Sequence, residues 1–551
     1  MNRIHTSAVI LLSTLCLGTA AVFHVDPRSG GAGGDGSSSN PWGTLREVVE
    51  GDLIETREWE SYPWEEGVGL TAKNAGAPVK AGDTLLLRSG YHGDVTISKY
   101  YNALPITIAA QDGHEPALKS LKLQACANWH VQGLTISPET APEYETVRML
   151  HIESHGYSGP SREITVESCR IFSVDDASGW SEGDWDTKSC NAVSVSGNRC
   201  TIRNNYCRNV DFGISVSGDS CLIEGNVVEN FAGDGLRGLG DDLTFRHNTV
   251  KNCYDVNSNH DDGFQSWSSG PDGVGTGTVY RLKLIGNTII NYTDPNQPFR
   301  GTLQGIGCFD GMFEGWIVSN NVVIVDHWHG ITLSGARNCH IVNNTVYDIT
   351  DSKPGPAWIR IGAHKDGTPS SGCIVRNNLA QSFQVDDSYC SACDHNLEYD
   401  NPASLFVDPS SYDMRLKPGC AAIDAGTEES APGQDIAGTV RPRGEGVDIG
   451  AYEYLDTSAR VVPGNGAFGG KTPRTQFTVY RRSGIVHIDL EALPHGALHP
   501  LVLHDMRGKL IARLHGTRHG PVIRYRMRTP SPSVRFCTAR AGAFSSGVII
   551  P

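Results

Sequence analysis

The chain has 551 residues, of which 63 are glycine, and a formal net charge of −15 at neutral pH. This length allows one large domain together with smaller ones. The apolar run at residues 8–17 is too short to span a bilayer comfortably and no other stretch could, so the sequence predicts no transmembrane segment. The basic composition after residue 460 comes without a zinc finger, a helix-turn-helix or interleaved aromatic and basic residues, so no nucleic-acid partner is expected.

Residues 1–21 have the pattern of a secretory signal peptide. Arg3 precedes the apolar run 8–17, and the small residues Gly18 to Ala21 follow it as a cleavage site. The mature chain is therefore expected to be exported as a soluble monomer. The extracellular space, the cell surface and the periplasm remain open as its location.

The mature chain would open with a recognisable phrase. Phe23-His24-Val25-Asp26-Pro27 is followed by a loop rich in Gly and Ser, and then by Asn40-Pro41-Trp42-Gly43-Thr44-Leu45. This phrase resembles the start of many secreted proteins of the pectate-lyase-like β-helix superfamily. The resemblance implies an N-terminal cap from Leu45 onward and first strands near residues 82–91. A stacked coil needs such a cap because its end exposes unpaired strand edges.

Two short phrases then alternate between residues 195 and 380. The first is a hydrophobic stretch that ends in asparagine, with its last residue at Asn205, Asn226, Asn248, Asn287, Asn321, Asn344 and Asn378. The steps between these asparagines are 21, 22, 39, 34, 23 and 34 residues. The second phrase is a polar residue, a glycine and an apolar residue, as in Asp262-Gly263-Phe264. A step near 22 residues with occasional insertions is typical of a coil that stacks on itself.

Each rung of this coil would consist of a few short strands joined by turns, because a single rung cannot bury its apolar side alone. Alternation as in Val193-Ser194-Val195 suits one buried and one wet face. Asparagine and glycine at the phrase ends suit turns that need positive φ, and stacked asparagines can hydrogen bond along the axis. The sequence therefore predicts an all-β, right-handed parallel β-helix of the pectin-lyase type.

Four cysteines each lie five residues before one of the repeated asparagines, namely Cys200, Cys221, Cys339 and Cys373. This spacing places them in one column, where we expect buried thiols rather than a zinc or redox site. The spacing of Cys390 and Cys393 favours a local disulfide, which export would permit.

Aligning the rungs on the glycine of the second phrase groups polar residues into columns. The position before glycine holds Phe212, Asp234, Asp262, Gln304 and His329, and the position two after it holds Ser215, Arg237, Gln265, Gly307 and Thr332. His260 and His327 lie three residues before glycine. Strict alternation sends Arg237 and Gln265 to the side opposite Asp262, so we assume a bend at the glycine. A purely structural coil would carry Ser, Thr and Asn at these positions. The face formed by residues 234–330 is therefore predicted to carry the functional site.

Two insertions support a site on this face. They add residues 266–271 and 291–300, and loops that protrude from a rigid coil can build the walls of a groove. Four aromatic residues in or near them could stack on sugar rings, namely Trp267, Tyr292, Phe299 and Trp328.

A long groove suits an extended polymer, and the family resemblance implies an acidic polysaccharide. Cleavage of a uronate polymer by β-elimination needs a group that neutralises the carboxylate, a base for the C5 proton and an acid for the leaving oxygen. We expect Arg237 and Arg300 to neutralise the carboxylate. The remaining catalytic candidates are His260, Asp262, His329 and Lys365. Candidate substrate contacts are Gln265, Trp267, Gln304, His327, Arg360 and His364.

Calcium is the cofactor that this composition suggests. Asp234, Asp261 and Asp262 offer carboxylate oxygens, which Ca²⁺ prefers, and the ion could also bridge to a substrate carboxylate.

Hydrolysis is the main alternative to a lyase. The order Asp234, Asp261-Asp262, His329-Gly330, Arg360 is similar to that of polygalacturonase-type glycosidases, which invert the anomeric centre with two carboxyl groups. The match is incomplete, because Gly362 stands where that family has lysine and no Asn-Thr precedes Asp234. A uronan epimerase and a noncatalytic carbohydrate-binding protein also remain open. Residues 190–380 resemble uncharacterised bacterial β-helix proteins of the polysaccharide-lyase-like group.

The end of the coil is predicted near residue 454. Phe406-Val407-Asp408-Pro409 and Asp448-Ile449-Gly450-Ala451-Tyr452 resemble the closing phrases of bacterial β-helix proteins, so residues 22–454 would form one domain. Residues 455–475 are expected to be a linker. Residues 476–551 are expected to form a small β-rich, sandwich-like domain. Its phrase at residues 501–510 resembles the sorting modules of type IX secretion substrates, which implies secretion machinery as a partner.

Overall fold

The computed structural model describes residues 20–455, apart from 295 and 351, and the backbone of eight strands between residues 476 and 549. The chain divides into two compact units, the first ending at Tyr454 and the second containing those eight strands. The predicted signal peptide and linker lie almost wholly outside the described residues. None of the helices in the described part of the chain has the length and apolar character needed to cross a bilayer.

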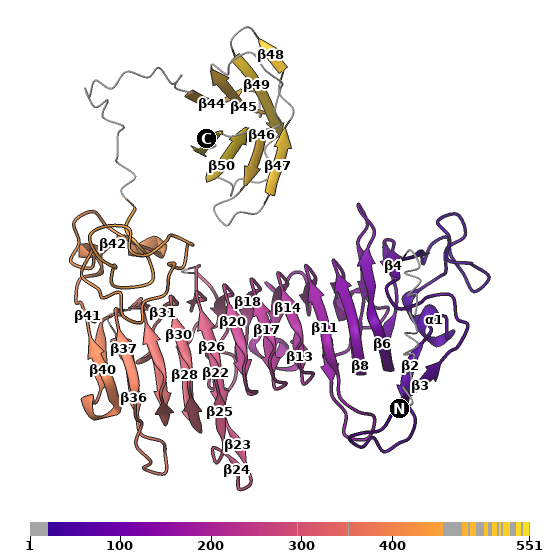
Figure 1. The fold of residues 1–551 in the computed structure, drawn as a ribbon, viewed down its shortest axis with the longest axis horizontal. Coiled ribbons are helices and arrows are strands. Elements are labelled where there is room, and N and C mark those ends of the chain that lie inside the picture. Colours follow the sequence, from indigo (N-terminus) through magenta and orange to yellow (C-terminus); the bar gives the residue numbers. More distant parts are fainter. Residues whose placement is uncertain are drawn as a thin grey trace, which may run out of the picture. The chain divides into compact units, whose positions relative to one another are not determined.

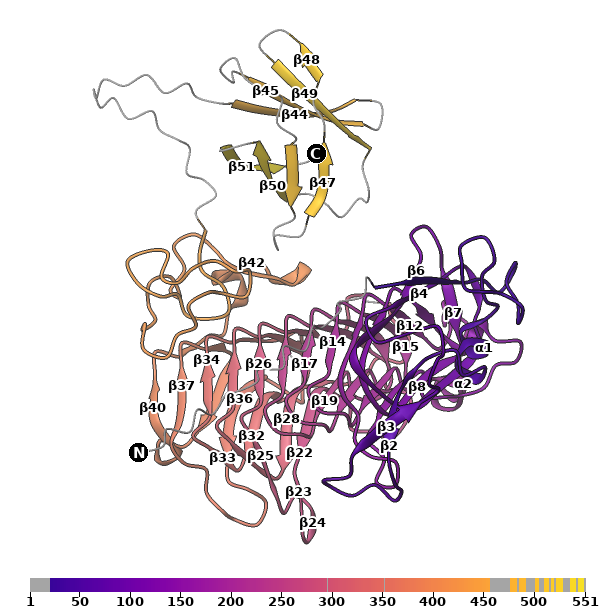
Figure 2. The ribbon, with the colours of Figure 1, turned by 45° about the vertical axis from the view of Figure 1, so that its right-hand side comes forward.

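The first unit is a coil of parallel strands with three faces, whose rungs are stacked along one axis (Figures 1 and 2). The first face contains β6 (Asp94–Ala110), β8 (Ser120–Gln132), β10 (Leu150–Glu153), β13 (Val193–Val195), β16 (Ile214–Val216), β19 (Leu236–Gly238), β22 (Asp262–Trp267), β28 (Gln304–Asp310), β32 (His329–Ser334), β36 (Trp358–Gly362) and β39 (Ser382–Val385). Strands β6 and β8 are long enough to turn the corner into the second face, and they join the two faces into one sheet.

The second face continues from β6 and β8. It contains β1 (Val22–Val25), β4 (Thr84–Leu87), β11 (Arg162–Glu167), β14 (Thr201–Arg203), β17 (Leu222–Glu224), β20 (Thr244–Arg246), β26 (Lys283–Ile285), β30 (Ile317–Ser319), β34 (His340–Val342), β37 (Cys373–Arg376) and β40 (Cys390–Asp394).

The third face is a separate twelve-stranded sheet. It contains β5 (Gly90–Tyr91), β7 (Pro116–Leu118), β9 (Thr135–Ile136), β12 (Arg170–Phe172), β15 (Tyr206–Val210), β18 (Val227–Phe231), β21 (Thr249–Cys253), β27 (Thr288–Ile290), β31 (Val322–Val325), β35 (Thr345–Asp348), β38 (Leu379–Ala380) and β41 (Leu397–Glu398). Together the three faces, formed by these two sheets, confirm the predicted all-β parallel β-helix.

The repeated asparagines form a continuous ladder inside the coil. Asn287 shows the pattern: its Nδ2 donates to Asn321 Oδ1 at 3.0 Å, and its own Oδ1 accepts from the side chain and the backbone N–H of Asn248. The same bond joins each asparagine to the next from Asn205 to Asn396. The predicted ladder is confirmed. The cysteine column is also buried, with Cys221 Sγ accepting from the backbone N–H of Cys200 at 3.3 Å.

Disulfides are absent from the described cysteines, all of which are free thiols. The prediction for Cys390 and Cys393 is therefore wrong. Both belong to β40, and their side chains contact each other there as two hydrogen-bonded thiols without a covalent bond.

The residues with positive φ at the turns are not the ones predicted. Positive φ falls on the residue before each ladder asparagine, for example 55° at Asn204 and 54° at Asn320, and not on the ladder asparagine itself. The glycines of the second phrase do not have positive φ either. Glycine is needed at these positions because there is no room for a Cβ atom. A Cβ at Gly263 would lie 2.4 Å from Ile289 Cγ2, and one at Gly330 would lie 2.3 Å from Val346 Cγ1. Third-face side chains therefore fill the room beneath each of these glycines.

The N-terminal end is covered as the resemblance implied. Helix α1 (Leu45–Glu50) starts with a capping box between Thr44 and Glu47 and buries Leu45 and Val48 in the main core. The hairpin of β2 (Thr56–Trp59) and β3 (Leu70–Lys73) follows it. Between the third and first faces, α2 (Glu182–Lys188) precedes β13.

The coil ends earlier than predicted. Its last strand is β41, and residues 402–454 contain only short 3-10 turns and the hairpin of β42 (Phe406–Asp408) and β43 (Asp413–Leu416). This segment, orange in Figure 1, packs Phe406 and Met414 against Val322 and Leu379 of the third face. It is a cover over the last rungs and not a further part of the coil.

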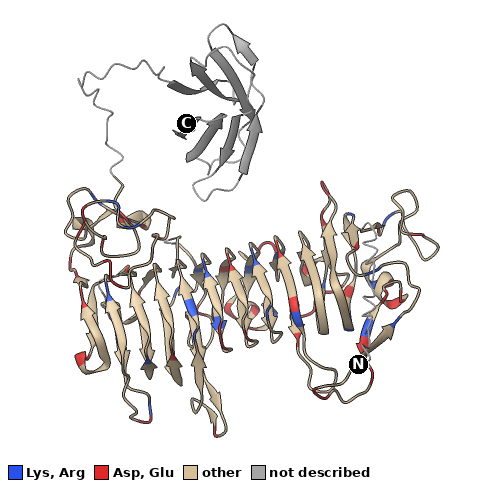
Figure 3. Ribbon diagram, viewed as in Figure 1, with Lys and Arg blue, Asp and Glu red and all other residues tan. Residues whose placement is uncertain are grey.

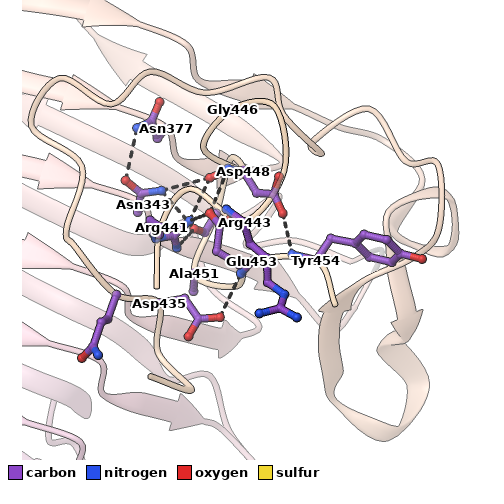
Figure 4. A network of polar contacts seen from close by, with 12 residues as sticks. Asn343, Asn377, Asp435, Arg441, Arg443, Gly446, Asp448, Ala451, Glu453 and Tyr454 are labelled. Atoms are coloured by element: carbon purple, nitrogen blue, oxygen red, sulfur yellow. Dashed lines mark hydrogen bonds and ion pairs between the residues drawn. The ribbon is translucent and has the colours of Figure 1, made fainter. Parts of the chain in front are cut away.

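A buried ion pair fastens this cover (Figure 4). Arg441 donates to Glu453, to Gly450 O at 2.8 Å and to Asn320 Oδ1 at 3.2 Å, while the backbone N–H of Glu453 donates to Asp435 Oδ2 at 2.9 Å. Arg441 and Glu453 are 7% and 4% exposed. Because Asn320 belongs to a turn of the coil, the network ties the cover directly to the rungs.

The second unit consists of two four-stranded antiparallel sheets. One is formed by β44 (Gln476–Arg482), β45 (Ile485–Glu491), β49 (Val522–Arg528) and β48 (Thr517–His519). The other is formed by β47 (Leu510–Leu514), β46 (Leu501–His504), β50 (Phe536–Ala541) and β51 (Phe544–Ile549). The sorting role predicted for this unit remains a prediction.

Candidate active site

The polar columns meet on the first face, at β19, β22, β28 and β32. The register pairs Arg237 with Gln265, Gln265 with Gly307, and Gly307 with Thr332, which is the alignment that the glycines predicted. Asp262 lies opposite Gln304 in the same sheet.

Asp262 is the buried centre of the site. Its Oδ2 accepts from Gln265 Nε2 at 2.9 Å and lies 3.3 Å from His260 Nδ1, so residues on both sides of Gly263 reach one carboxylate, as the assumed bend requires. The side chain is fully buried, and Oδ1 has no hydrogen-bond partner among the described residues. Burial raises the pKa of Asp262 to about 7. A Cβ at Gly307 would lie 2.0 Å from that Oδ1, so this glycine leaves room for the carboxylate.

His260 and Asp262 form a histidine–carboxylate dyad. The hydrogen bond that His260 donates to Asp262 raises the pKa of His260, whose side chain is 60% exposed. With Nδ1 directed at the carboxylate, Nε2 is left to exchange a proton, and Gln304 Nε2 contacts it. This is the arrangement of an oriented general base.

Asp234 connects the dyad to Arg237. Its Oδ1 accepts from the backbone N–H of Asp262 at 3.0 Å, and its Oδ2 pairs with Arg237 Nε. The Arg237 guanidinium lies 3.8 Å from the centre of the Phe212 ring and 5.3 Å from that of Trp267. Since Nε alone is bonded to Asp234, the terminal nitrogens of Arg237 remain for an anion.

Two further histidines, His327 and His329, lie two rungs beyond the dyad strand, across the ring of Phe309 on the rung between. That ring is 6.2 Å from His260 and 4.8 Å from His329, centre to centre, and His327 stacks on His329 at 5.2 Å. Burial lowers the pKa of both His327 and His329 to about 4. Both imidazoles are therefore neutral at pH 7.

His329 belongs to a small polar cluster with Thr332 and Trp358. Trp358 Nε1–H, which can only donate, lies 3.2 Å from both His329 Nδ1 and Thr332 Oγ1, and these two acceptor candidates are 2.9 Å apart. His327 Nδ1 accepts from the backbone N–H of His329 at 3.1 Å, so the neutral His327 ring carries its hydrogen on Nε2.

Other predicted site residues make their contacts elsewhere. Asp261 turns toward Cys253, whose Sγ donates to it at 3.4 Å, and burial raises the pKa of Asp261 to about 8. Arg300 lies 4.4 Å over the ring of Tyr292, and Lys365 pairs with Asp310 at 2.5 Å. His364 pairs with Asp366 at 2.8 Å.

Arg360 continues the row of Arg237 and Gln265 on β36, opposite Thr332. It is exposed and makes no ion pair with any described residue, and its guanidinium is 5.7 Å from the ring of Trp358. Trp358 in turn stacks on Trp328, which is 38% exposed, at 6.0 Å. The roles of Phe309, Trp358 and Phe212 were missed, although the spacing Trp358-Ile359-Arg360 already placed Trp358 beside the row.

The three aspartates do not fit calcium. Both carboxylate oxygens of Asp234 are already bonded, one to Arg237 and one to a backbone N–H. Asp261 is directed at Cys253, whereas Ca²⁺ needs six to eight oxygen ligands around one point. In the described part of the chain, no group of three or more His, Cys, Asp or Glu side chains is arranged to hold a metal ion.

Residues 189–379 match the family model described as "Right handed beta helix region". No curated protein matches the chain. Among solved structures, the pectate lyase Pel9A is similar with 14% identity and a TM-score of 0.43, covering 80% of this chain and 97% of its own. The A-module of the mannuronan C-5 epimerase AlgE6 from Azotobacter vinelandii has 12% identity and a TM-score of 0.36, covering 58% of this chain and 91% of its own. The tailspike of E. coli bacteriophage HK620, in a double mutant, has 10% identity and a TM-score of 0.34, with 85% and 81% covered.

Proposed function

We propose that this right-handed parallel β-helix is an exported polysaccharide lyase that cleaves a uronate-containing polymer by β-elimination. The observation that carries the proposal is the His260–Asp262 dyad, which lies beside an arginine with free terminal nitrogens. Arg237 would neutralise the uronate carboxylate through its terminal nitrogens, which makes the C5 proton more acidic. His260 Nε2 would then remove that proton, with Asp262 stabilising the imidazolium that forms. The electron pair of the C5–H bond would form the C4=C5 double bond as the C4–O4 bond breaks, and the imidazolium would return its proton to the leaving O4. His329, two rungs away on β32, would contact a neighbouring sugar of the chain.

The geometry favours elimination over hydrolysis. An inverting hydrolase needs two carboxyl groups that reach the sugar from opposite sides with room for water. Here Asp262 is fully buried, Asp234 is 2% exposed, and Asp261 is turned toward Cys253. The group that reaches the surface is the imidazole of His260, 60% exposed.

The test is a screen of the purified protein on alginate, glucuronan and pectate with two readouts. A lyase produces a 4,5-unsaturated uronide that absorbs in the ultraviolet, whereas a hydrolase produces reducing ends without that absorbance. Reducing ends alone would overturn the proposal, and so would deuterium uptake at C5 without chain cleavage, which indicates an epimerase. Calcium is not required by this mechanism, so a chelator is expected to leave the rate unchanged.

His260→Gln is expected to reduce the lyase rate at least 100-fold, because glutamine cannot accept the C5 proton. The matched control is His130→Gln on the second face, where His130 pairs with Glu167 at 2.8 Å in a similar dyad. The control variant should keep the full rate. Equal rates for His260→Gln and the unmodified protein would contradict the role of His260.

A further inference from the structure

A cavity of about 400 Å³ lies on the first face over β10, β13, β16 and β19, on the N-terminal side of the dyad. Its lining is polar, with Ser194 and Ser215 as the floor and Arg148, His151 and Arg237 among the other lining residues. The register makes these residues one row, because His151 pairs with Ser194, Ser194 with Ser215 and Ser215 with Arg237. The cavity is therefore continuous with the candidate active site through Arg237.

Small side chains create the depression. Serine occupies the row on two successive rungs, where the neighbouring positions carry His151 and Arg237. The strand residues on either side of Ser194 and Ser215 are buried, namely Val193, Val195, Ile214 and Val216, and of these Val195 and Val216 also line the cavity. The two serines add hydroxyls to this lining, and hydroxyls suit hydrogen bonds to sugar.

Arg148 supplies an unpaired positive charge to this cavity. Several other cations along the coil are paired with acids, as in Arg203–Glu167, Arg246–Glu224 and Arg281–Asp242. Lys and Arg accordingly lie among Asp and Glu along the coil (Figure 3). Arg148 is exposed, lines the cavity and makes no ion pair with any described residue. Glu153, which also lines the cavity, is already paired with Lys122 at 2.5 Å.

We propose that this cavity is a remote subsite that binds another acidic sugar of the same chain, with its carboxylate on Arg148. The inference rests on the proposed function, since it concerns the same polymer. Strand β10, which Arg148 precedes, lies four rungs from the dyad strand β22, a distance of about 19 Å at the usual strand spacing. Arg360 lies three rungs beyond β22 on the other side, or about 14 Å. The polymer therefore passes the dyad on both sides, and cleavage falls in the interior of the chain.

Binding is measured by calorimetry with the His260→Gln variant, which holds the polymer without cleaving it. Adding Arg148→Ala is expected to weaken binding of the long polymer roughly tenfold, and Arg148→Lys is expected to restore part of it. For an oligomer shorter than the four-rung span, Arg148→Ala should make no difference. The matched control, Lys283→Ala, removes one exposed positive charge from the second face and should change nothing.

Kinetics supply the second arm in the otherwise unmodified enzyme. Arg148→Ala should raise KM for the long polymer with kcat unchanged, and early products should be long fragments rather than terminal units. Equal polymer binding with and without Arg148, or release of terminal units from the start, would overturn the subsite. A protein that binds the polymer through Arg148 but cleaves none would refute the proposed lyase activity and leave the subsite standing.

Discussion

At the scale of single residues, the pairing of His260 with Asp262 predicts how the rate depends on pH. A base works in its deprotonated form, so the rate rises as pH passes upward through the pKa of His260, which Asp262 raises. Asp262→Asn removes the negative charge and lowers that pKa. The acid limb of the kcat/KM profile should therefore move to lower pH, and the maximum rate should fall at least tenfold.

The control for this shift is Glu167→Gln, which removes the carboxylate partner of His130 on the second face. Its pH profile should coincide with that of the unmodified protein. An acid limb that stays in place in Asp262→Asn would mean that another group is the base.

The register of the site residues could be predicted from the sequence, but the orientation of some side chains could not. The columns correctly aligned Arg237 with Gln265, because a repeat converts spacing into register. Asp261 and Asp262 look equivalent as neighbours in the sequence, yet one faces Cys253 and the other His260. The packing at Gly263 involves a residue that local sequence does not reveal, because the Ile289 side chain beneath this glycine comes from a strand in another face.

At the scale of elements, the asparagine ladder carries much of the stability of the coil. Asn287→Ala removes two donated and two accepted hydrogen bonds and leaves the buried backbone N–H of Asn248 without its acceptor. We expect a loss of about 3 kcal/mol or more in the free energy of unfolding. Urea titration measures it, and Asn396→Ala, at the half-buried end of the ladder, should cost clearly less. Equal losses at the two positions would contradict a cooperative ladder.

The ladder was predictable because an identical residue recurs at a nearly constant step. The glycines were predicted equally well in position but for the wrong reason. Positive φ is a local property that a turn sequence reveals, whereas the space beneath Gly263 and Gly330 is set by Ile289 and Val346 from the third face. Reasoning about turns alone could not supply that contact.

At the scale of the whole β-helix unit, the buried pair of Arg441 and Glu453 holds the cover on the last rungs. Arg441→Ala leaves the Glu453 carboxylate buried without its cation, which should cost about 3–5 kcal/mol. Hydrogen exchange should show lost protection across residues 420–454. Arg415→Ala, which breaks a half-exposed pair with Asp413, is the control and should change stability by less than about 1 kcal/mol. Unchanged protection in Arg441→Ala would show that packing alone holds the cover.

The extent of the coil was the part of the fold predicted least well. Phrases such as Asp448-Ile449-Gly450 suggested that the coil itself continues to about residue 454. The last rung ends at Glu398, and the closing phrases belong to the cover instead. The sequence of the cover does not repeat. Periodicity therefore cannot show whether such a segment is a cover or an irregular rung of the coil.

The fixed spacing between rungs has a consequence for how this protein could change its substrate. Lengthening a loop moves neither Arg148 nor Arg360 relative to the dyad, because each is carried by a strand or its flank in the sheet. The separation of these three points can change only in whole rungs, by about 4.8 Å at a time. Insertion or loss of one rung would therefore change, in a single step, the spacing of substrate charges that the groove can match. The catalytic groups themselves would stay the same.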